Sequence, residues 1–413
     1  DALLGYLGIP RVHDLPTFLE TLMLLHCNGA LTSSALSSIS CSGGEASLIA
    51  DIAASYDVHF PDLTAAQKSA LAKALGPMVS LSNPLDYHTY IWNDLARMTA
   101  AWLPMAADHI GLTLILLDYP HTDATAWENA TRAAINVRRA SGQPVAVVAT
   151  LPELLPDDVV AELIAAGVTP LRGMAEALGA AAAAQVRVAA AQPPLLAGAE
   201  APTTTLSEAQ AKAVLAAHGV TVPQCVTGQA GSLDAAARNL PGPFAVKSQG
   251  IAHKSEAGAL RLGVAPDELD RSASEMPGQD FLVESMVQGV VAELLVGVVR
   301  DLAHGFVMTL AAGGVLTELW QDRVSMLLPV ERDGVAQALT RLRIYPLLTG
   351  YRGAAAVHMP ALVDAVLAVQ TYVMSNQEQV YEVEINPLMC TASAAIAADA
   401  LIVCAKDPTK AGE

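Results

Sequence analysis

Residues 243–263 read PFAVKSQGIAHKSEAGALRLG, and the interpretation of the second half of the chain depends on this stretch. It begins as a short apolar strand ending at Lys247, passes through a glycine-containing loop with His253, and returns to an apolar run. A lysine at a strand end beside small residues suits a polyphosphate, because the ammonium neutralises charge while backbone N–H groups approach closely. The histidine could accept a phosphoryl group as a nucleophile. A solvated lysine and a surface histidine are the alternative interpretation.

The composition indicates a globular protein whose main partners are small molecules. A chain of 413 residues is long enough for two or more domains. Its 41 acidic and 23 basic residues give a net charge of -18, which disfavours nucleic acid and anionic membranes as partners. The five cysteines are scattered without a CxxC pair. We therefore expect a cytoplasmic protein with neither a zinc site nor a disulfide framework.

The first half of the chain alternates short apolar strands with amphipathic helices. This spacing predicts a doubly wound parallel sheet, flavodoxin-like or Rossmann-like in class. The predicted strands are residues 35–41, 77–81, 112–117, 144–149 and 168–171, and the predicted helices include 14–26, 45–56, 92–106, 127–140, 157–166 and 174–190.

A possible anion site lies between the first of these strands and its helix. Ser42, Gly43 and Gly44 separate the two elements, and a helix that begins at such a turn presents free N–H groups to an anion. Glu45 follows directly, and a carboxylate at this position puts phosphate binding there in doubt.

A proline-containing segment, residues 191–205, reads as an interdomain linker. Beyond it, residues 206–413 predict an α+β domain. It opens with a helix over 206–218, and further helices are expected over 333–342 and 361–375. The predicted strands are residues 244–247, 259–264, 281–286, 292–299, 306–310, 315–320, 380–385 and 394–398.

Four motifs follow one another in this second half, namely FAVK with HKS and Gly258, FLVESM with ELLVGV, GGVLTEL from Gly313, and EVEINPL with Asp399. In this order they resemble the ATP-grasp domain of ADP-forming acyl-CoA synthetases, relatives of succinyl-CoA synthetase. Residues 31–190 resemble a CoA-ligase domain of the same enzymes through Ser-Gly-Gly and Asn-Pro-Leu-Asp. Residues 1–30 would then be the tail of a preceding CoA-ligase domain.

The resemblance implies a role for each matching residue. Mg²⁺ prefers oxygen ligands, which Asn386 and Asp399 supply. Glu384 lies one strand period from Asn386 and could assist, or could be a solvated strand carboxylate. The implied ATP-binding residues are Lys247, Gly258, Glu284, Met286 and Glu293, with the segment from Glu284 to Met286 forming the hinge against adenine.

In these enzymes ATP phosphorylates a histidine, an acyl phosphate forms, and coenzyme A attacks it. The resemblance implies that His253 relays the phosphoryl group to the Ser42-Gly43-Gly44 half of the chain. The family's primary phosphohistidine lies just upstream of the segment that Asp1 begins. We therefore expect turnover to need a CoA-binding domain upstream in the same polypeptide or on a partner subunit.

The loop at residues 83–92, NPLDYHTYIW, is the best clue to the acid that is activated. Its aromatic residues could line a pocket for an aromatic acid or a bulky carboxylate. This form looks like that of feruloyl-CoA synthetases of the ADP-forming type. The alternative is that the rings pack the loop against the sheet. The candidate pocket residues are Asn83, Asp86, Tyr87, His88 and Trp92.

The resulting hypothesis is an acid–thiol ligase that uses ATP, Mg²⁺ and coenzyme A and is a homo-oligomer. A nucleotide-binding regulatory module, like the synthetase-like part of a protein acyltransferase, is the rival. Retention of Lys247, His253, Asn386 and Asp399 favours the enzyme. An ATP-grasp carboxylate–amine ligase would fit the second half but would leave residues 1–190 unexplained.

Overall fold

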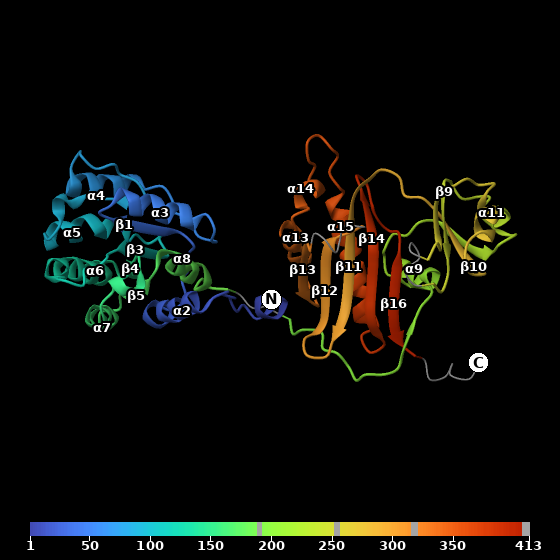
Figure 1. Ribbon diagram of the computed structural model, residues 1–413, viewed down its shortest axis with the longest axis horizontal. Helices are drawn as coiled ribbons and strands as arrows, with labels where there is room; N and C mark the ends of the chain where they lie inside the picture. Colours follow the sequence, from blue (N-terminus) through green and yellow to red (C-terminus); the bar gives the residue numbers. More distant parts are fainter. Residues whose placement is uncertain (188–191, 252–256, 315–320, 407–413) are drawn as a thin grey trace. The chain divides into compact units, whose positions relative to one another are not determined.

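The computed structural model describes residues 1–187, 192–251, 257–314 and 321–406. The chain divides into two compact units (Figure 1). One unit is Gly8–Ala189, and the other combines Asp1–Leu7 with Ala190–Glu413. Among the described helices, none is both long and apolar enough to cross a membrane.

The unit Gly8–Ala189 is built on a parallel sheet of five strands in the order β2-β1-β3-β4-β5. Four of its strands are almost wholly buried runs of apolar and small residues, as strands covered on both faces should be. The doubly wound, flavodoxin-like prediction is confirmed. The strands are β1 (Leu36–Ser40), β2 (Leu85–Asp86), β3 (Leu112–Leu116), β4 (Val145–Ala149) and β5 (Thr169–Arg172).

Helices cover both faces of this sheet (Figure 1). Leu114 and Leu116 face one helical layer, whereas Ile115 between them faces the other, because side chains alternate along a strand. The first layer is α2 (Leu15–Asn28), α3 (Gly43–Ala53) and α8 (Met174–Ala183), and the second is α4 (Ala65–Leu75), α5 (Leu95–Trp102), α6 (Glu128–Ser141) and α7 (Asp157–Ala165).

Several predicted boundaries in this unit are wrong. Residues 77–81 form no strand. Val79 lies in an irregular segment and its side chain is buried, so its apolar character reflects packing and not a strand. The second strand is Leu85–Asp86, which is too short to show a periodicity. The helix predicted from residue 92 begins at Leu95, where the side chain of Asp94 caps it. The last helix ends at Ala183, and α4 was not predicted.

The second unit contains a small antiparallel sheet in the order β7-β10-β8-β9. The short helices α10 (Leu233–Ala236) and α11 (Leu269–Ser274) pack on one face, against Phe244, Val246 and Val283. The opposite face therefore carries Ala245 and Lys247 of β8. The strands are β7 (Cys225–Gln229), which was not predicted, β8 (Phe244–Ser248), β9 (Leu260–Val264) and β10 (Asp280–Ser285).

A larger sheet follows the order β13-β12-β11-β14-β16-β6, and β15 pairs with β14. Helices α13 (Arg332–Thr340), α14 (Tyr345–Leu348) and α15 (Met359–Ser375) cover one face (Figure 1). The first helix, α1 (Ala2–Tyr6), lies beside β13. The strands are β6 (Thr203–Thr205), β11 (Val290–Asp301), β12 (Gly305–Ala312), β13 (Arg323–Leu327), β14 (Val380–Thr391), β15 (Ala395–Ala397) and β16 (Ala400–Ala405).

Two predictions about this sheet need correction. The segment read as a linker contributes β6, because Thr203 to Thr205 pair with the exposed edge of β16. Strand β14 does not end at Ile385 but continues through Asn386 and Pro387 to Thr391, paired with β11. The strand predicted over residues 315–320 lies outside the described residues.

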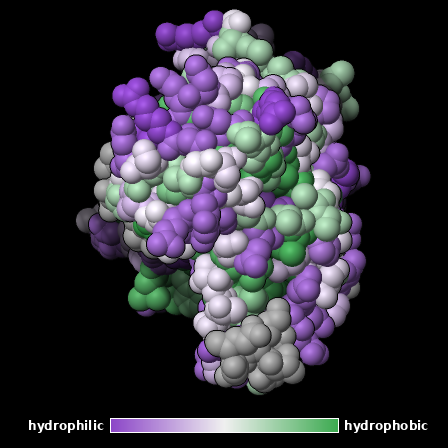
Figure 2. Space-filling view, turned by 90° about the vertical axis from the view of Figure 1, so that its right-hand side faces the viewer, coloured by the Kyte–Doolittle hydropathy of each residue, from purple (hydrophilic) through white to green (hydrophobic). Residues whose placement is uncertain are grey.

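Figure 2 shows the side of the molecule that carries β9 and α11 in Figure 1. Hydrophilic residues lie interspersed with smaller apolar areas in that view.

Helix α9 (Glu208–Ala217) packs on β16 and α15 and is the first helix after β6, with Ser207 as its cap. The side chain of Ser207 accepts a hydrogen bond from Gln210, whose amide oxygen accepts one from the Ser207 N–H in return.

Candidate functional site

The predicted phosphate-binding lysine lies in a buried polar cluster. Lys247 is on the face of β8 that the small helices leave uncovered, and Glu284 is on the same face of the paired strand β10. Only 6% of Lys247 and 2% of Glu284 are exposed. The Lys247 Nζ lies 2.8 Å from Glu284 Oε2 and donates to the carbonyl oxygen of Ala398 at 2.5 Å.

Helix α9 supplies two more charges to this cluster. Glu208 and Lys212 lie one turn apart, and both are buried. The Glu208 Oε1 accepts from Lys247 Nζ at 2.6 Å and lies 2.8 Å from Lys212 Nζ. Lys212 Nζ also contacts both carboxylate oxygens of Glu284, at 2.5 and 2.8 Å, and donates to Ala398 O at 2.6 Å. The two lysines thus share two carboxylates and one carbonyl.

The cluster pulls the pKa values of its two lysines in opposite directions. Burial lowers the pKa of Lys247, but the carboxylates of Glu208 and Glu284 outweigh this effect and raise it above the ordinary value. Burial and then repulsion from Lys247 lower the pKa of Lys212, although the same carboxylates oppose the shift. We conclude that Lys247 stays charged, with carboxylates as its partners.

Sequence reasoning missed Glu208 and Lys212, although a signal was present. Ala211 and Leu215 are wholly buried and mark the apolar face of α9. Glu208 lies three residues before Ala211, and Lys212 lies three before Leu215, so both charges fall on that face. Charges on an apolar helix face indicate buried partners, because burying an unpaired charge is very costly.

The three predicted metal ligands lie close together at the neighbouring part of the large sheet. Glu384 and Asn386 share a face of β14, and the Asn386 Nδ2 lies 3.4 Å from Glu384 Oε1. The Asn386 N–H donates to the carbonyl oxygen of Asp399 at 3.3 Å. All three residues are partly exposed. Their oxygens suit Mg²⁺.

The three predicted metal ligands include only two carboxylates, those of Glu384 and Asp399. Within the four described ranges, no group of three or more His, Cys, Asp and Glu side chains gathers as a metal site would. The amide oxygen of Asn386 would therefore have to serve as a ligand beside the two carboxylates.

The other predicted ATP-binding residues lie around the two sheets. Glu293 is on the face of β11 that points away from the helices, close to Gly314. The thioether sulfur of Met286 accepts a hydrogen bond from the N–H of Gly263 at 3.0 Å. Gly258 is exposed with φ of 66°, a conformation that glycine adopts without strain. His253 lies outside the described residues.

The predicted anion site at α3 is surrounded by carboxylates. The order of the sheet reverses between β1 and β3, and ligands of such sheets bind at the carboxyl ends of those strands. Ser42 caps α3 there, accepting from the Glu45 N–H at 3.4 Å. A carboxylate oxygen of Asp86 lies 3.2 Å from where a Cβ on Gly43 would be. Gly44 occupies the second position of the helix.

Burial, followed by repulsion from Asp118 and Asp86, raises the pKa of Glu45 to about 7. Asp118 itself accepts hydrogen bonds from the N–H and hydroxyl of Thr150, at 2.7 and 2.6 Å. The start of α3 thus carries several acidic groups, and an approaching phosphate would meet like charge.

Some aromatic side chains of the 83–92 loop pack against the core, and others are accessible to solvent. Tyr87 is 1% exposed and packs edge-on against Trp102 in the core, and Trp92 packs against Trp127. Tyr90 is exposed instead and His88 is partly exposed, with their rings 5.7 Å apart. For Tyr87 the structure favours the packing alternative.

Two polar residues fix the shape of this loop. The Asn83 amide oxygen accepts from Ser38 N–H, and its nitrogen donates to the carbonyls of Leu36 and Pro61. The Asp86 carboxylate accepts from the His88 N–H at 2.9 Å, which stabilises the positive φ of 56° at His88. Asn83 therefore holds the loop against β1.

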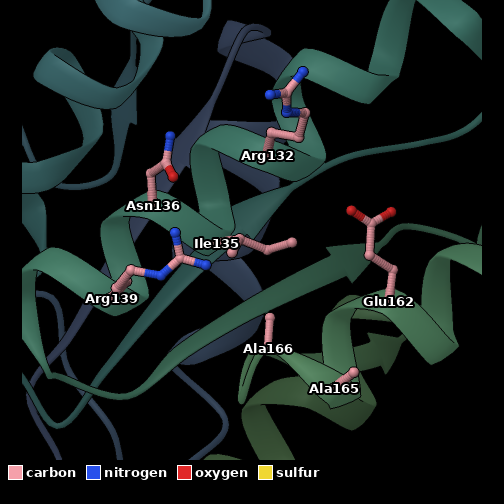
Figure 3. Close-up of a pocket in the computed structure, with 7 residues that line it drawn as sticks. All are labelled: Arg132, Ile135, Asn136, Arg139, Glu162, Ala165 and Ala166. Atoms are coloured by element: carbon pink, nitrogen blue, oxygen red, sulfur yellow. The ribbon is translucent and has the colours of Figure 1, made fainter.

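A surface pocket of about 440 Å³ lies elsewhere in the unit Gly8–Ala189, between α6 and α7 (Figure 3). Arg132 and Arg139 come from α6 and Glu162 from α7, and the view shows all three around the opening. None of the residues lining this pocket is a predicted site residue.

Comparison with protein families decides the identity of the second unit. Residues 197–404 match the ATP-grasp domain. The chain belongs to the ATP-grasp family. The matched range contains the buried cluster of Lys247 and the oxygen donors of Asn386 and Asp399, so these groups lie within an ATP-grasp domain.

Three curated relatives resemble the chain over about half of its length. The β subunit of ADP-forming acetate–CoA ligase II from Pyrococcus furiosus is 28% identical over 218 residues, covering 48% of this chain and 92% of the relative. The β subunit of ligase I from the same organism is 27% identical, covering 50% and 94%. A trans-feruloyl-CoA synthase from an unknown prokaryote is 29% identical over 213 residues, covering 48% and 30%.

Similar solved structures include acetyl-coenzyme A synthetase 1 of Ca. Korarchaeum cryptofilum with coenzyme A and Mg-AMPPCP. The TM-score is 0.44 at 25% identity, and the alignment covers 48% of this chain and 92% of that chain. PH1788 from Pyrococcus horikoshii also has a TM-score of 0.44 at 25% identity, covering 49% and 93%.

Proposed function

We propose that the chain is the ATP-grasp-bearing part of an ADP-forming acyl-CoA synthetase. The reaction would convert an acid, ATP and coenzyme A to acyl-CoA, ADP and phosphate. The observation that carries this proposal is Lys247: it is buried and charged within an ATP-grasp domain, and it donates to the carbonyl oxygen of Ala398, the residue before the proposed metal ligand Asp399. The names of the curated relatives, two of them ADP-forming acetate–CoA ligases, support the same class.

The residues of the site divide the work of binding ATP. Lys247 would neutralise the phosphates, and the strand end from Glu284 to Met286 would hold the adenine. Glu384, Asn386 and Asp399 would hold Mg²⁺, which supplies further positive charge to the phosphate oxygens when bound. Glu293 and Gly258 would line the nucleotide from either side.

His253 is the proposed phosphoryl carrier. A nitrogen of its neutral imidazole would form a bond to phosphorus as the bond from phosphorus to the leaving group breaks. The phosphoryl group would pass to the substrate carboxylate, and the thiol of coenzyme A would then displace phosphate from the acyl phosphate. Ser42, Gly43 and Gly44 are the proposed contacts of the travelling phosphoryl group.

For the acid we propose an aromatic carboxylate such as a hydroxycinnamate, ferulate for example. Tyr90 is exposed and His88 partly exposed on the 83–92 loop, and both could contact an aromatic ring and its carboxylate. Asp86 lies 3.7 Å from His88, and Trp92 follows two residues after Tyr90. The feruloyl-CoA synthase among the relatives supports this choice, whereas the acetate ligases, at similar identity, favour a small acid.

Labelled ATP and Mg²⁺, incubated with the full-length protein, coenzyme A and single acids, test the proposal. We expect ADP release that depends on both coenzyme A and the acid, and acid-labile, base-stable label on the protein. AMP as the product would refute it. Lys247→Met should abolish ADP release, whereas Lys406→Met, a matched change at an exposed lysine of the same unit, should leave it intact. Full turnover by His253→Ala would exclude the relay.

The same assay separates the rival function and the substrates. A regulatory module would bind ATP but release no ADP with any acid. Comparing acetate, propionate and ferulate tests the aromatic acid, and His88→Ala should raise the KM for ferulate more than that for acetate. Equal effects on both acids would argue against a ring contact.

The proposal extends to partners and location. A CoA-binding domain, in the same polypeptide or on a partner subunit, would complete the enzyme, and the curated acetate ligases are named as β subunits. We propose a cytoplasmic homo-oligomer, in keeping with the free state of all five cysteines. Light scattering of the purified protein tests the oligomer, and a monomeric mass would refute it.

A further inference from the structure

The buried cluster contains a second lysine for which the proposed chemistry has no use. Lys212 is 1% exposed, less than Lys247 at 6%, and it lies on α9 instead of a strand of the small sheet. Three of its contacts duplicate those of Lys247, because each ammonium reaches Glu208, Glu284 and the carbonyl oxygen of Ala398. The cluster is therefore symmetric in its contacts.

The charges of the four side chains that contact one another, two lysines and two carboxylates, add to zero, and the carboxylate of Asp399 acts on Lys247 from outside this set. This balance matters because an uncompensated charge at such depth is strongly unfavourable. If Lys247 transfers its hydrogen bonds to ATP, Glu208 and Glu284 lose a cation. They keep Lys212, which already lies within 2.8 Å of both carboxylates.

We propose that Lys212 is a positioning residue for nucleotide binding, acting as the standing counter-ion that lets Lys247 leave the two carboxylates for the ATP phosphates. This inference rests on the proposed function. Without Lys212, two carboxylates would compete with ATP for Lys247 alone. Binding ATP would then leave both acids buried without a cation.

The test measures binding of a non-hydrolysable Mg-ATP analogue to the full chain by calorimetry. Lys212→Met should raise the Kd of the analogue roughly 10- to 100-fold, the range of an ordinary coupling between two sites. Removing one acid as well restores the charge balance, so the double variant Glu208→Gln/Lys212→Met should return the Kd to within about fivefold of wild type. Lys406→Met is the matched control at an exposed lysine.

The rescue distinguishes positioning from a merely structural role. A structural role would weaken binding in the double variant at least as much as in the single one. If Lys212→Met does not fold, the binding of the Mg-ATP analogue to Glu208→Gln/Lys212→Met decides alone. If this double variant folds but binds the analogue no better than Lys247→Met, Lys212 acts on the nucleotide directly, and the inference is overturned.

The outcomes also separate this inference from the function on which it rests. A wild-type chain that fails to bind the Mg-ATP analogue would contradict the proposed function. A wild-type chain that binds it, together with a folded Lys212→Met that binds equally well, would contradict the inference alone.

Discussion

The two predicted phosphate-binding regions differ in how their carboxylates are neutralised. At β8 and α9 each buried acid has lysines within 2.8 Å, and Lys247 remains charged. At the start of α3 the acids face one another, and the pKa of Glu45 rises to about 7. In the proposed function, the first region would exchange one anionic partner of a lysine for another when phosphate binds. The second would have to bind phosphate with the partial charge of the helix and the N–H groups of Gly43 and Gly44.

The largest effect is expected from removing a cation from the balanced cluster. Lys247→Met leaves Glu208 and Glu284 with one lysine and should lower the free energy of unfolding by about 3–5 kcal/mol. Urea unfolding measures this, with Lys406→Met as the control. Glu208→Gln/Lys247→Met should recover much of the stability but no ATP binding. A loss below about 1 kcal/mol in the single variant would mean that the acids are not buried as described.

The second largest loss of stability is expected in the loop that brings Asp86 to the start of α3. Asn83→Ala removes three hydrogen bonds and leaves the N–H of Ser38 without its acceptor. We expect a loss of about 2–3 kcal/mol in unfolding free energy. Ser82→Ala removes one exposed hydrogen bond next to it and should cost less than about 1 kcal/mol. Equal losses would show that Asn83 does not hold the loop.

The crowded acids predict a pH dependence with a definite sign. The folded-state pKa of Glu45, about 7, exceeds the ordinary value of 4.5, so the folded chain binds the proton more tightly than the unfolded chain. Stability is then lost as the pH rises from 4.5 to 7. Because Glu45 is half-buried and screened, we expect about 1 kcal/mol. Glu45→Gln should abolish this contribution, so its gain over wild type should be larger at pH 8 than at pH 5.

The smallest expected effects come from the helix caps of the two regions. Ser207 and Gln210 form a reciprocal capping box on α9, whereas Ser42 caps α3 through one bond of 3.4 Å. Ser207→Ala should cost about 1 kcal/mol and Ser42→Ala about 0.5 kcal/mol, measured by urea unfolding. A larger loss for Ser42→Ala would assign the start of α3 a structural importance that its geometry does not suggest.

Local patterns predicted most of the fold. Buried runs such as Val145–Ala149 are too short for a typical helix and favour strands covered on both faces, and their spacing with helices implies the parallel sheet that the structure contains. Short elements were missed. Leu85–Asp86 is only two residues long, and β7, with small and polar residues such as Thr227 and Gly228, has no apolar alternation to detect. Such strands are recognised only by the backbone hydrogen bonds that they form with neighbouring strands, and a sequence pattern does not show these bonds.

The site was predicted less completely than the fold. Lys247 and Glu284 were assigned to ATP separately, and their contact depends on the register of β8 with β10. Tyr87 was a candidate for the substrate pocket, but it fills the core beside Trp102. An aromatic side chain in a loop can line a substrate pocket or fill the core, and only the packing around it distinguishes these two roles.

By itself, the sequence determined the class of the fold, the order of the ATP-grasp motifs and the placement of Lys247 at a strand end. These follow from short-range periodicity and from residue types, which act over a few neighbours. Only the tertiary structure decided that Lys212 and Lys247 share two carboxylates, and that acids gather at α3. Both depend on side chains that are distant along the chain yet within a few ångströms in space, where burial makes charge interactions strong.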